Sequence, residues 1–280
     1  LYSLPASLAL GVASTVSAQT TFQGGDIMTA GNWDPSGLPD SAGNTGSIGV
    51  DGTAGTNVSG LFINQTAGDI TNAGLMTFNS TEWTTTGGSI SNGNVFRLEN
   101  GSNFTIDGGS LSTTDEFRII GADMNMNSGS LTSDGAFVLR GEFVMNGGDI
   151  TVTDDWGDKF TSVGGGDTFF NGGTFSAGQL NFRGSNTRFI FGGSTAGSVT
   201  VGDFGGPNHN ASNIDIDWLS GSQMTFEVTA STIAGATGLG WAEFLWGEDQ
   251  MTFNGQSGTD LGINWATAIS SGGLGGGENF

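Results

Sequence analysis

Asp107-Gly108-Gly109-Ser110-Leu111 is the phrase on which the fold of this chain depends. Related phrases stand at Thr66–Ile70, Thr86–Ile90, Asn127–Leu131, Asn146–Ile150, Asn171–Phe175 and Phe191–Ser194. Counted between the last glycines of successive phrases, the steps are 20, 21, 20, 19, 25 and 20 residues. A fixed period in the twenties predicts a solenoid, in which each repeat is one coil that buries its apolar face only against neighbouring coils.

Short runs between these phrases predict which solenoid this is. The clearest runs are Val95–Leu98, Phe117–Ile120 and Phe137–Arg140, in which apolar residues alternate with other residues over a few positions. This period is typical of a half-buried strand and is too short for a helix. The Gly-Gly corners supply the positive φ that a turn requires. The Leu-x-x-Leu-x-Leu frame of a leucine-rich repeat, the rival at this period, is missing. We therefore predict an all-β fold, a single-chain parallel β-helix of about 20 residues per coil with atypical capping regions at both ends.

Composition supports an ordered chain that is not a nucleic-acid binder. The 52 glycines among 280 residues would by themselves suit a disordered chain, but 20 phenylalanines are also present, many of them in phase with the repeat. Acidic residues outnumber basic ones by 27 to 6, giving a net charge of −21. This balance excludes nucleic acid as a partner, because phosphates are neutralised by clustered lysine and arginine. The chain has no cysteine and therefore no disulfide or thiolate site.

Changes of composition divide the chain into four regions. Residues 1–18 combine an apolar stretch with the sequence Val16-Ser17-Ala18-Gln19, the pattern of a cleaved secretory signal peptide. The alternative is a retained apolar segment that caps the rod or joins subunits. Residues 19–59 are predicted to form an N-terminal entry or cap, residues 60–205 the solenoid repeats, and residues 206–280 a C-terminal β cap that covers the exposed strand edges.

The opening of the chain also carries a family resemblance. It contains Gly31-Asn32-Trp33-Asp34-Pro35, then Gly37-Leu38-Pro39-Asp40, then the short apolar strand Gly46–Val50. With the signal-like start and the glycine-rich repeats, this opening resembles secreted bacterial β-solenoid surface proteins of the autotransporter-passenger and PEP-CTERM-sorted type. The resemblance covers most of the chain and implies a secreted or cell-surface location. The residues that carry it determine shape and not chemistry, so they imply no substrate.

Residues able to support catalysis are scarce. The chain has one histidine, His209, one lysine, Lys159, and neither a Ser-His-Asp arrangement nor a phosphate-binding loop. Glycoside hydrolysis requires two carboxylates about 5–10 Å apart across a cleft, and Asp154-Asp155 is the one Asp-Asp pair of the repeat region. We therefore predict that the protein is not an enzyme.

Calcium is the cofactor that the acidic turns favour. Oxygen ligands from Asp154, Asp155 and Asp158 are the predicted metal site, with Asp203, Asp215 and Asp217 as a second set.

The arginines indicate a structural role and not a ligand site. Arg97 and Arg118 occupy equivalent places in successive coils, each beside a glutamate, which predicts stacked ion pairs.

These observations favour a non-enzymatic extracellular β-solenoid with a structural or adhesive role. A sharper form of this hypothesis is self-association of rods end to end into a filament or surface matrix, because an open strand edge is suited to β-augmentation. The alternative is a β-helix that binds or cleaves an extracellular polysaccharide. An exposed aromatic row would favour that alternative, and the tryptophans to inspect are Trp83, Trp156, Trp241 and Trp246.

Overall fold

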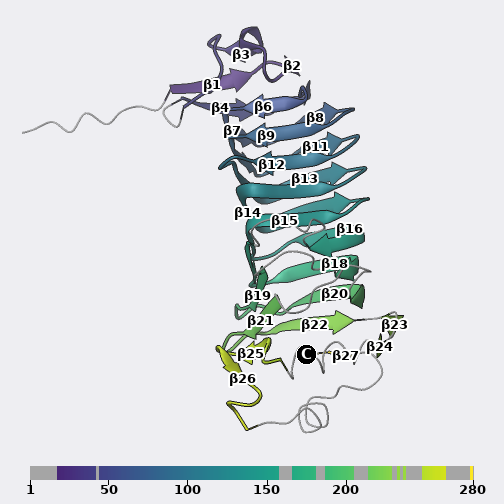
Figure 1. Cartoon of the computed structure of the whole chain (residues 1–280). Coiled ribbons are helices and arrows are strands. Elements are labelled where there is room, and N and C mark those ends of the chain that lie inside the picture. Colours follow the sequence, from purple (N-terminus) through teal and green to yellow (C-terminus); the bar gives the residue numbers. More distant parts are fainter. Residues whose placement is uncertain are drawn as a thin grey trace, which may run out of the picture.

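The protein is a column of stacked β-coils. The computed structural model describes residues 18–41, 44–157, 166–180, 187–204, 214–228, 232–233, 236–237, 248–262 and 278–279. Within these residues the elements are strands, apart from one 3-10 turn, η1 (Ala30–Asn32). The strands form parallel coils of about 21 residues that lie one on another (Figure 1). The predicted all-β parallel β-helix is therefore confirmed.

Each complete coil contributes strands to three faces. The first face is built by β1 (Ala18–Phe22), β4 (Asn44–Ile48), β7 (Phe62–Gln65), β10 (Glu82–Thr85), parts of β13 (Asn103–Thr113), β14 (Phe117–Ser133) and β15 (Phe137–Met145), then β17 (Asp167–Phe170), β19 (Thr187–Phe191), β21 (Ile214–Trp218) and β25 (Met251–Phe253). The long strands β13 and β14 pass through a corner, so each pairs with neighbours on more than one face.

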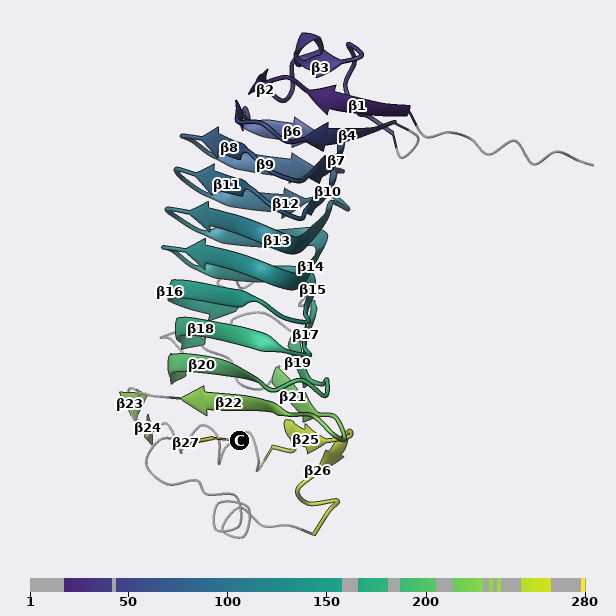
Figure 2. The same cartoon turned by 180° about the vertical axis from the view of Figure 1, so that it is seen from behind.

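The second face is seen most clearly from the other side (Figure 2). It is built by β2 (Gly25–Asp26), β5 (Gly52–Thr53), β8 (Asp69–Asn72), β11 (Ser89–Asn92), the ends of β13 and β14, then β16 (Asp149–Gly157), β18 (Gly173–Leu180), β20 (Gly197–Phe204) and β22 (Met224–Val228). The third face is built by β6 (Asn57–Ser59), β9 (Met76–Asn79), β12 (Phe96–Glu99) and parts of β14, β15, β16, β18 and β20.

The interior is a set of continuous side-chain stacks. Phe96, Phe117 and Phe137 pair in register on successive coils and are fully buried. The rings of Phe96 and Phe117 lie 5.3 Å apart at 9°, and those of Phe117 and Phe137 lie 5.2 Å apart. A similar contact joins Phe191 to Trp218, with ring centroids 5.0 Å apart. Because the alternation repeats in phase, these coils place their apolar residues above those of the previous coil, and Phe96, Phe117 and Phe137 all point inward.

The Gly-Gly corners have the predicted backbone conformation. The last glycine of each phrase has positive φ, for example +77° at Gly88 and +76° at Gly109. At Gly88 the available space also excludes a side chain, since an added Cβ would lie 2.3 Å from the carbonyl oxygen of Gly68 on the preceding coil. The corner therefore needs glycine for two separate reasons: conformational freedom and close coil-to-coil approach.

Antiparallel strands are added to the column at both ends. At the N-terminal end β3 (Trp33–Asp34) pairs antiparallel with β1, and the indole Nε1 of Trp33 donates to the carbonyl oxygen of Ile27 at 2.9 Å. Phe22 and Trp33 are buried in this cap. At the other end β26 (Gln256–Ser257) pairs with β25, and β27 (Glu278–Asn279) pairs with β22. A separate hairpin joins β23 (Thr232–Ile233) to β24 (Ala236–Thr237).

The stacked coils extend beyond the Gly-Gly phrases in both directions. β4, β5 and β6 already pair in register with β7, β8 and β9, ahead of residue 60, and β21 and β22 continue the first two faces beyond residue 205. These coils retain the apolar alternation although they lack the glycine phrase. The predicted signal segment lies outside the described residues except for Ala18.

Replacing Gly88 by alanine separates the two requirements of the corner. Gly101 also has positive φ, +74°, but an added Cβ there would meet nothing within 4 Å. We expect Gly101→Ala to lower the free energy of unfolding by about 1 kcal/mol, the cost of the backbone conformation alone. Gly88→Ala should cost about 2–4 kcal/mol, because overpacking adds about 1–3 kcal/mol. Urea unfolding of both variants measures the difference, and equal losses would contradict a close approach between coils.

Truncation of one ring tests the interior stack. Phe117 is fully buried between Phe96 and Phe137, so Phe117→Ala should lower the free energy of unfolding by about 3–5 kcal/mol through lost burial and a residual cavity. Thr132→Ala, at an exposed outward position of the same strand, is the control and should change it by less than about 0.5 kcal/mol. A loss below about 1 kcal/mol for Phe117→Ala would show that the stack is not continuous there.

Candidate functional site

The second face presents two columns of hydroxyl side chains, which we call the hydroxyl face. Strand alternation buries one residue between the columns on each coil, such as Ile90 and Leu111, and leaves its two neighbours outward. The first column holds Asp69, Ser89, Ser110, Ser130, Asp149, Thr174, Ser198 and Thr225. The second column holds Thr53, Thr71, Ser91, Ser112, Thr132, Thr151, Ser176, Thr200 and Glu227.

The register of the coils makes this face a regular array. Parallel strands lie about 4.8 Å apart, and residues two apart on a strand are separated by about 6.6 Å. No register shift interrupts the pairing of β8, β11 and the end of β13, so the hydroxyls of these coils are aligned. The Ser112 Oγ donates to the Ser91 Oγ at 3.4 Å, and the Ser89 Oγ donates to the Asp69 carboxylate at 2.6 Å. Hydroxyl groups on such a face serve as both donors and acceptors for a ligand.

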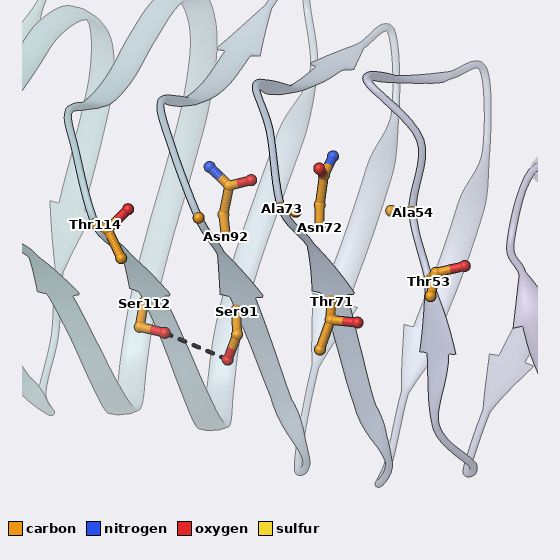
Figure 3. A pocket seen from close by; sticks show the side chains of 10 residues that line it. Thr53, Ala54, Thr71, Asn72, Ala73, Ser91, Asn92, Ser112 and Thr114 are labelled. Atoms are coloured by element: carbon orange, nitrogen blue, oxygen red, sulfur yellow. Dashed lines mark hydrogen bonds between the residues drawn. The ribbon is translucent and has the colours of Figure 1, made fainter.

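A shallow groove of about 510 Å³ runs along the second column. One side is formed by the hydroxyl residues Thr53, Thr71, Ser91 and Ser112, which belong to four successive coils (Figure 3). The other side is the corner after each strand, formed by Ala54, Asn72, Ala73, Asn92, Gly93 and Thr114. The lining contains no charged side chain. The groove therefore repeats the same short motif, hydroxyl then amide or small residue, from coil to coil.

Two asparagines in the groove lining have different hydrogen bonding. The Asn72 carboxamide donates to the carbonyl oxygens of Gly55 and Leu75, at 2.9 and 3.3 Å, and its Oδ1 accepts from the Gly74 amide at 2.6 Å. Asn92 occupies the same register position one coil later and is only 2% exposed. Its Nδ2 donates to the Asn94 carbonyl at 2.5 Å and to the Thr113 hydroxyl at 3.5 Å, but its Oδ1 has no partner. The Asn92 corner thus leaves a buried acceptor without the amide that satisfies Asn72.

The first face carries charged side chains as well as hydroxyls. Glu82 and Asp123 stand in one outward column with Asn103 between them. Further along this face Arg188 lies between two carboxylates, 3.5 Å from Asp167 and 3.3 Å from Asp215. A smaller groove of about 280 Å³ beside Glu82 is lined also by Thr45, Phe62, Ile63, Asn64, Thr84 and Thr86. The side chains of Arg188, Asp167 and Asp215 are partly exposed, so the two ion pairs of Arg188 contribute only about 0–1 kcal/mol each to stability.

The predicted calcium ligands are only partly described. Asp154 is exposed on β16, whereas the side chain of Asp155 and the whole of Asp158 lie outside the described residues. Within the described ranges no group of three or more histidine, aspartate or glutamate side chains is placed to hold a metal ion. In the second predicted set, Asp215 is paired with Arg188, and Asp217 accepts hydrogen bonds from the Thr252 hydroxyl and the Gly255 amide. Calcium binding by the first set stays a prediction.

The predicted arginine positions are confirmed. Arg97 and Arg118 are register partners on the third face. Arg97 lies 3.7 Å from Glu99, and Arg118 forms an ion pair with Glu116. Each ion pair joins two residues of the same coil, so each arginine is held by an acidic residue two positions away.

The groove along the second column was not evident from the sequence, because it depends on which corner residues the register places beside the Ser/Thr column.

The tryptophans do not form an exposed row in the described part of the chain. Trp83 is fully buried, and Trp33 and Trp218 are nearly so. The side chain of Trp156 and the whole of Trp241 and Trp246 lie outside the described residues, as do Lys159 and His209. The described faces therefore offer no row of exposed tryptophans on which a sugar could stack.

Comparison with known proteins gives no further guide to the site. No family model, curated protein or solved structure matches this chain. Among the described residues there is also no helix with the length and hydrophobicity needed to span a membrane.

The two asparagines give a direct test of the described groove. Asn72→Ala removes three hydrogen bonds and leaves their backbone partners unsatisfied, which should cost about 1–3 kcal/mol of unfolding free energy. Asn92→Ala also removes a buried oxygen that has no partner, so its cost should be smaller by about 1 kcal/mol. Paired urea-unfolding curves measure this difference. A larger cost for Asn92→Ala would mean that the Asn92 oxygen is satisfied in the folded protein.

Proposed function

We propose that this protein is a non-enzymatic structural and adhesive rod that works outside the cell, at the cell surface or in the extracellular matrix. The observation that carries this proposal is the regular hydroxyl face, in which outward Ser and Thr residues repeat on successive coils from β5 to β22. A surface that repeats one motif along a rod suits many weak contacts with an extended partner, because linked contacts reinforce one another.

The interior supports the mechanical part of this role. Ring stacks such as Phe96–Phe117–Phe137 run along the axis, and backbone hydrogen bonds join each coil to the next. Nearest-neighbour contacts therefore extend through the column, as in other repeat proteins. The net charge of −21 favours solubility and discourages lateral clumping of rods.

The ends of the column bear on the predicted filament. End-to-end β-augmentation needs an open strand edge. At the N-terminal end β3 pairs with the outer side of β1, and η1 lies beside β2, where the Asn32 side chain donates to the Asp26 carbonyl at 2.9 Å. At the other end β26 and β27 add antiparallel strands. We therefore propose discrete rods, and self-association through the ends stays a prediction.

Polysaccharide recognition is the second candidate. An aromatic platform does not support it, since Trp83 and the phenylalanine stacks are buried. The observation that favours it is the uncharged groove with hydroxyl and amide groups beside Ser91 and Ser112. If the groove binds a polysaccharide through hydrogen bonds, the adhesive rod and the polysaccharide binder are one function, because an adhesive rod needs a surface to which it adheres.

Location and attachment test the proposed function together. Antibody labelling of intact producing cells should detect the protein before permeabilisation, and a strain lacking the gene should attach less to surfaces or to other cells. Re-expression of the full chain is the control and should restore attachment. Labelling that appears only after permeabilisation, with unchanged attachment, would contradict an extracellular adhesive role.

A further inference from the structure

We propose that the groove beside Glu82 on the first face binds a cationic amino sugar, one hexosamine unit of an extracellular polysaccharide. This inference names a ligand for the adhesive rod and rests on the proposed function, and its site is separate from the groove on the hydroxyl face. It is carried by three side chains of different chemistry that the register brings together: the Phe62 ring, the Asn64 carboxamide and the Glu82 carboxylate.

The register of β7 and β10 assembles the site. Phe62 pairs with Glu82, and Asn64 pairs with Thr84. All four side chains point outward, because the residue between them on each strand is buried in the core. Neighbouring strands lie about 4.8 Å apart, and residues two apart on one strand are separated by about 6.6 Å. The four side chains therefore frame an area that one pyranose ring covers, and the groove of about 280 Å³ above them suits a single sugar unit.

The charge of the groove selects a cation. The Glu82 side chain is exposed and forms no ion pair within the described part of the chain. Among the described residues that line the groove, none is basic. An ammonium group beside this carboxylate gains a charge-assisted hydrogen bond and also contacts the neighbouring Phe62 ring. Further along the same face Arg188 lies between the carboxylates of Asp167 and Asp215, so the spacing of the coils accommodates a cation beside outward carboxylates.

Asn64 supplies an acceptor that the protein leaves unused. Its side chain lies on the outward side of β7 and lines the groove, and its Oδ1 is buried without a hydrogen-bond partner. Buried acceptors are normally satisfied. A hydroxyl group of a sugar bound over β7 would donate to this oxygen.

The rest of the lining distinguishes an amino sugar from a lysine side chain of a protein partner. Thr45, Thr84 and Thr86 add three hydroxyl groups, which accept hydrogen bonds as well as donate them. The partly exposed Phe62 ring suits the apolar face of a pyranose ring. A cationic sugar therefore uses the carboxylate, the carboxamide, the hydroxyls and the ring together, whereas a lysine side chain uses only the carboxylate and the ring.

Binding of short probes tests the ligand. Isothermal titration calorimetry of the full chain at physiological salt compares the linear tetramer of glucosamine, the same tetramer fully N-acetylated, and tetralysine. We expect the glucosamine tetramer to bind about tenfold more tightly than either of the others, because N-acetylation removes the ammonium groups and tetralysine has no hydroxyl groups. Absence of binding by the glucosamine tetramer would overturn the inference, as would a preference of less than about threefold over either comparison probe.

Two matched pairs of substitutions locate the site. Glu82→Gln removes the carboxylate of the groove, whereas Asp123→Asn makes the same change in the same outward column, two coils away and outside the lining. Asn64→Ala removes the unused acceptor, and Asn125→Ala is its control in the neighbouring column. We expect Glu82→Gln and Asn64→Ala each to weaken binding of the glucosamine tetramer about tenfold, and each control to leave it within about twofold. Equal weakening in a variant and its control would overturn the site, because the net charge alone would then attract the probe.

The attachment assay separates this inference from the proposed function. If the glucosamine tetramer does not bind but the wild-type chain still restores attachment, the site assignment fails and the adhesive role stands. If the tetramer binds as expected but the wild-type chain does not restore attachment, the proposed function fails and the site stands. Reduced attachment with Glu82→Gln, and full attachment with Asp123→Asn, is the result expected when both are right.

Discussion

The in-register stacking of one coil on the next is the constraint on which the rest of the structure depends. Each strand of the column gives its backbone hydrogen bonds to the coils before and after it, so a strand has no stable place without its neighbours. The same register aligns the phenylalanines inside and the hydroxyls outside, as at Phe96 and Phe117 or at Ser91 and Ser112. One periodicity in the sequence therefore generates both the core and the outward array.

The corners maintain this register. An external ladder of amide side chains follows the Gly-Gly corners: Asn171 donates to Asn146 at 2.9 Å, Asn146 donates to Asn127 at 2.7 Å, and Asn127 donates to the Asp107 carboxylate. Each such hydrogen bond contributes only about 0.5–1.5 kcal/mol. These hydrogen bonds favour one register, because every side chain of the ladder has a partner only when the corners are aligned. The asparagine that precedes the glycines thus aligns neighbouring coils while the glycines make the turn.

Much of the fold could be predicted from the sequence, because the features that build a coil are local and repeated. The Gly-Gly phrase and the alternating runs are sufficient for strands, corners and inward aromatic residues. The extent of the column was harder to predict, because β4–β6 and β21–β22 pair in register without the glycine phrase. The cap formed by Trp33 and Ile27 depends on contacts between residues that carry no repeat. The candidate groove was hidden for a related reason: Ser91, Asn92 and Gly93 look like turn residues until the register aligns them with Thr71, Asn72 and Ala73.

The measurement that tests the register most directly is disulfide formation between paired positions of neighbouring coils. The chain has no cysteine, and Ser91 and Ser112 are register partners whose hydroxyl oxygens lie 3.4 Å apart. In the double variant S91C/S112C, mild oxidation of the folded protein should form the crosslink rapidly, since parallel partners about 4.8 Å apart are within disulfide reach. S91C/S110C, in which Ser110 instead pairs with Ser89, should oxidise much more slowly. Faster crosslinking in S91C/S110C, or none in either variant, would contradict the aligned stacking of coils.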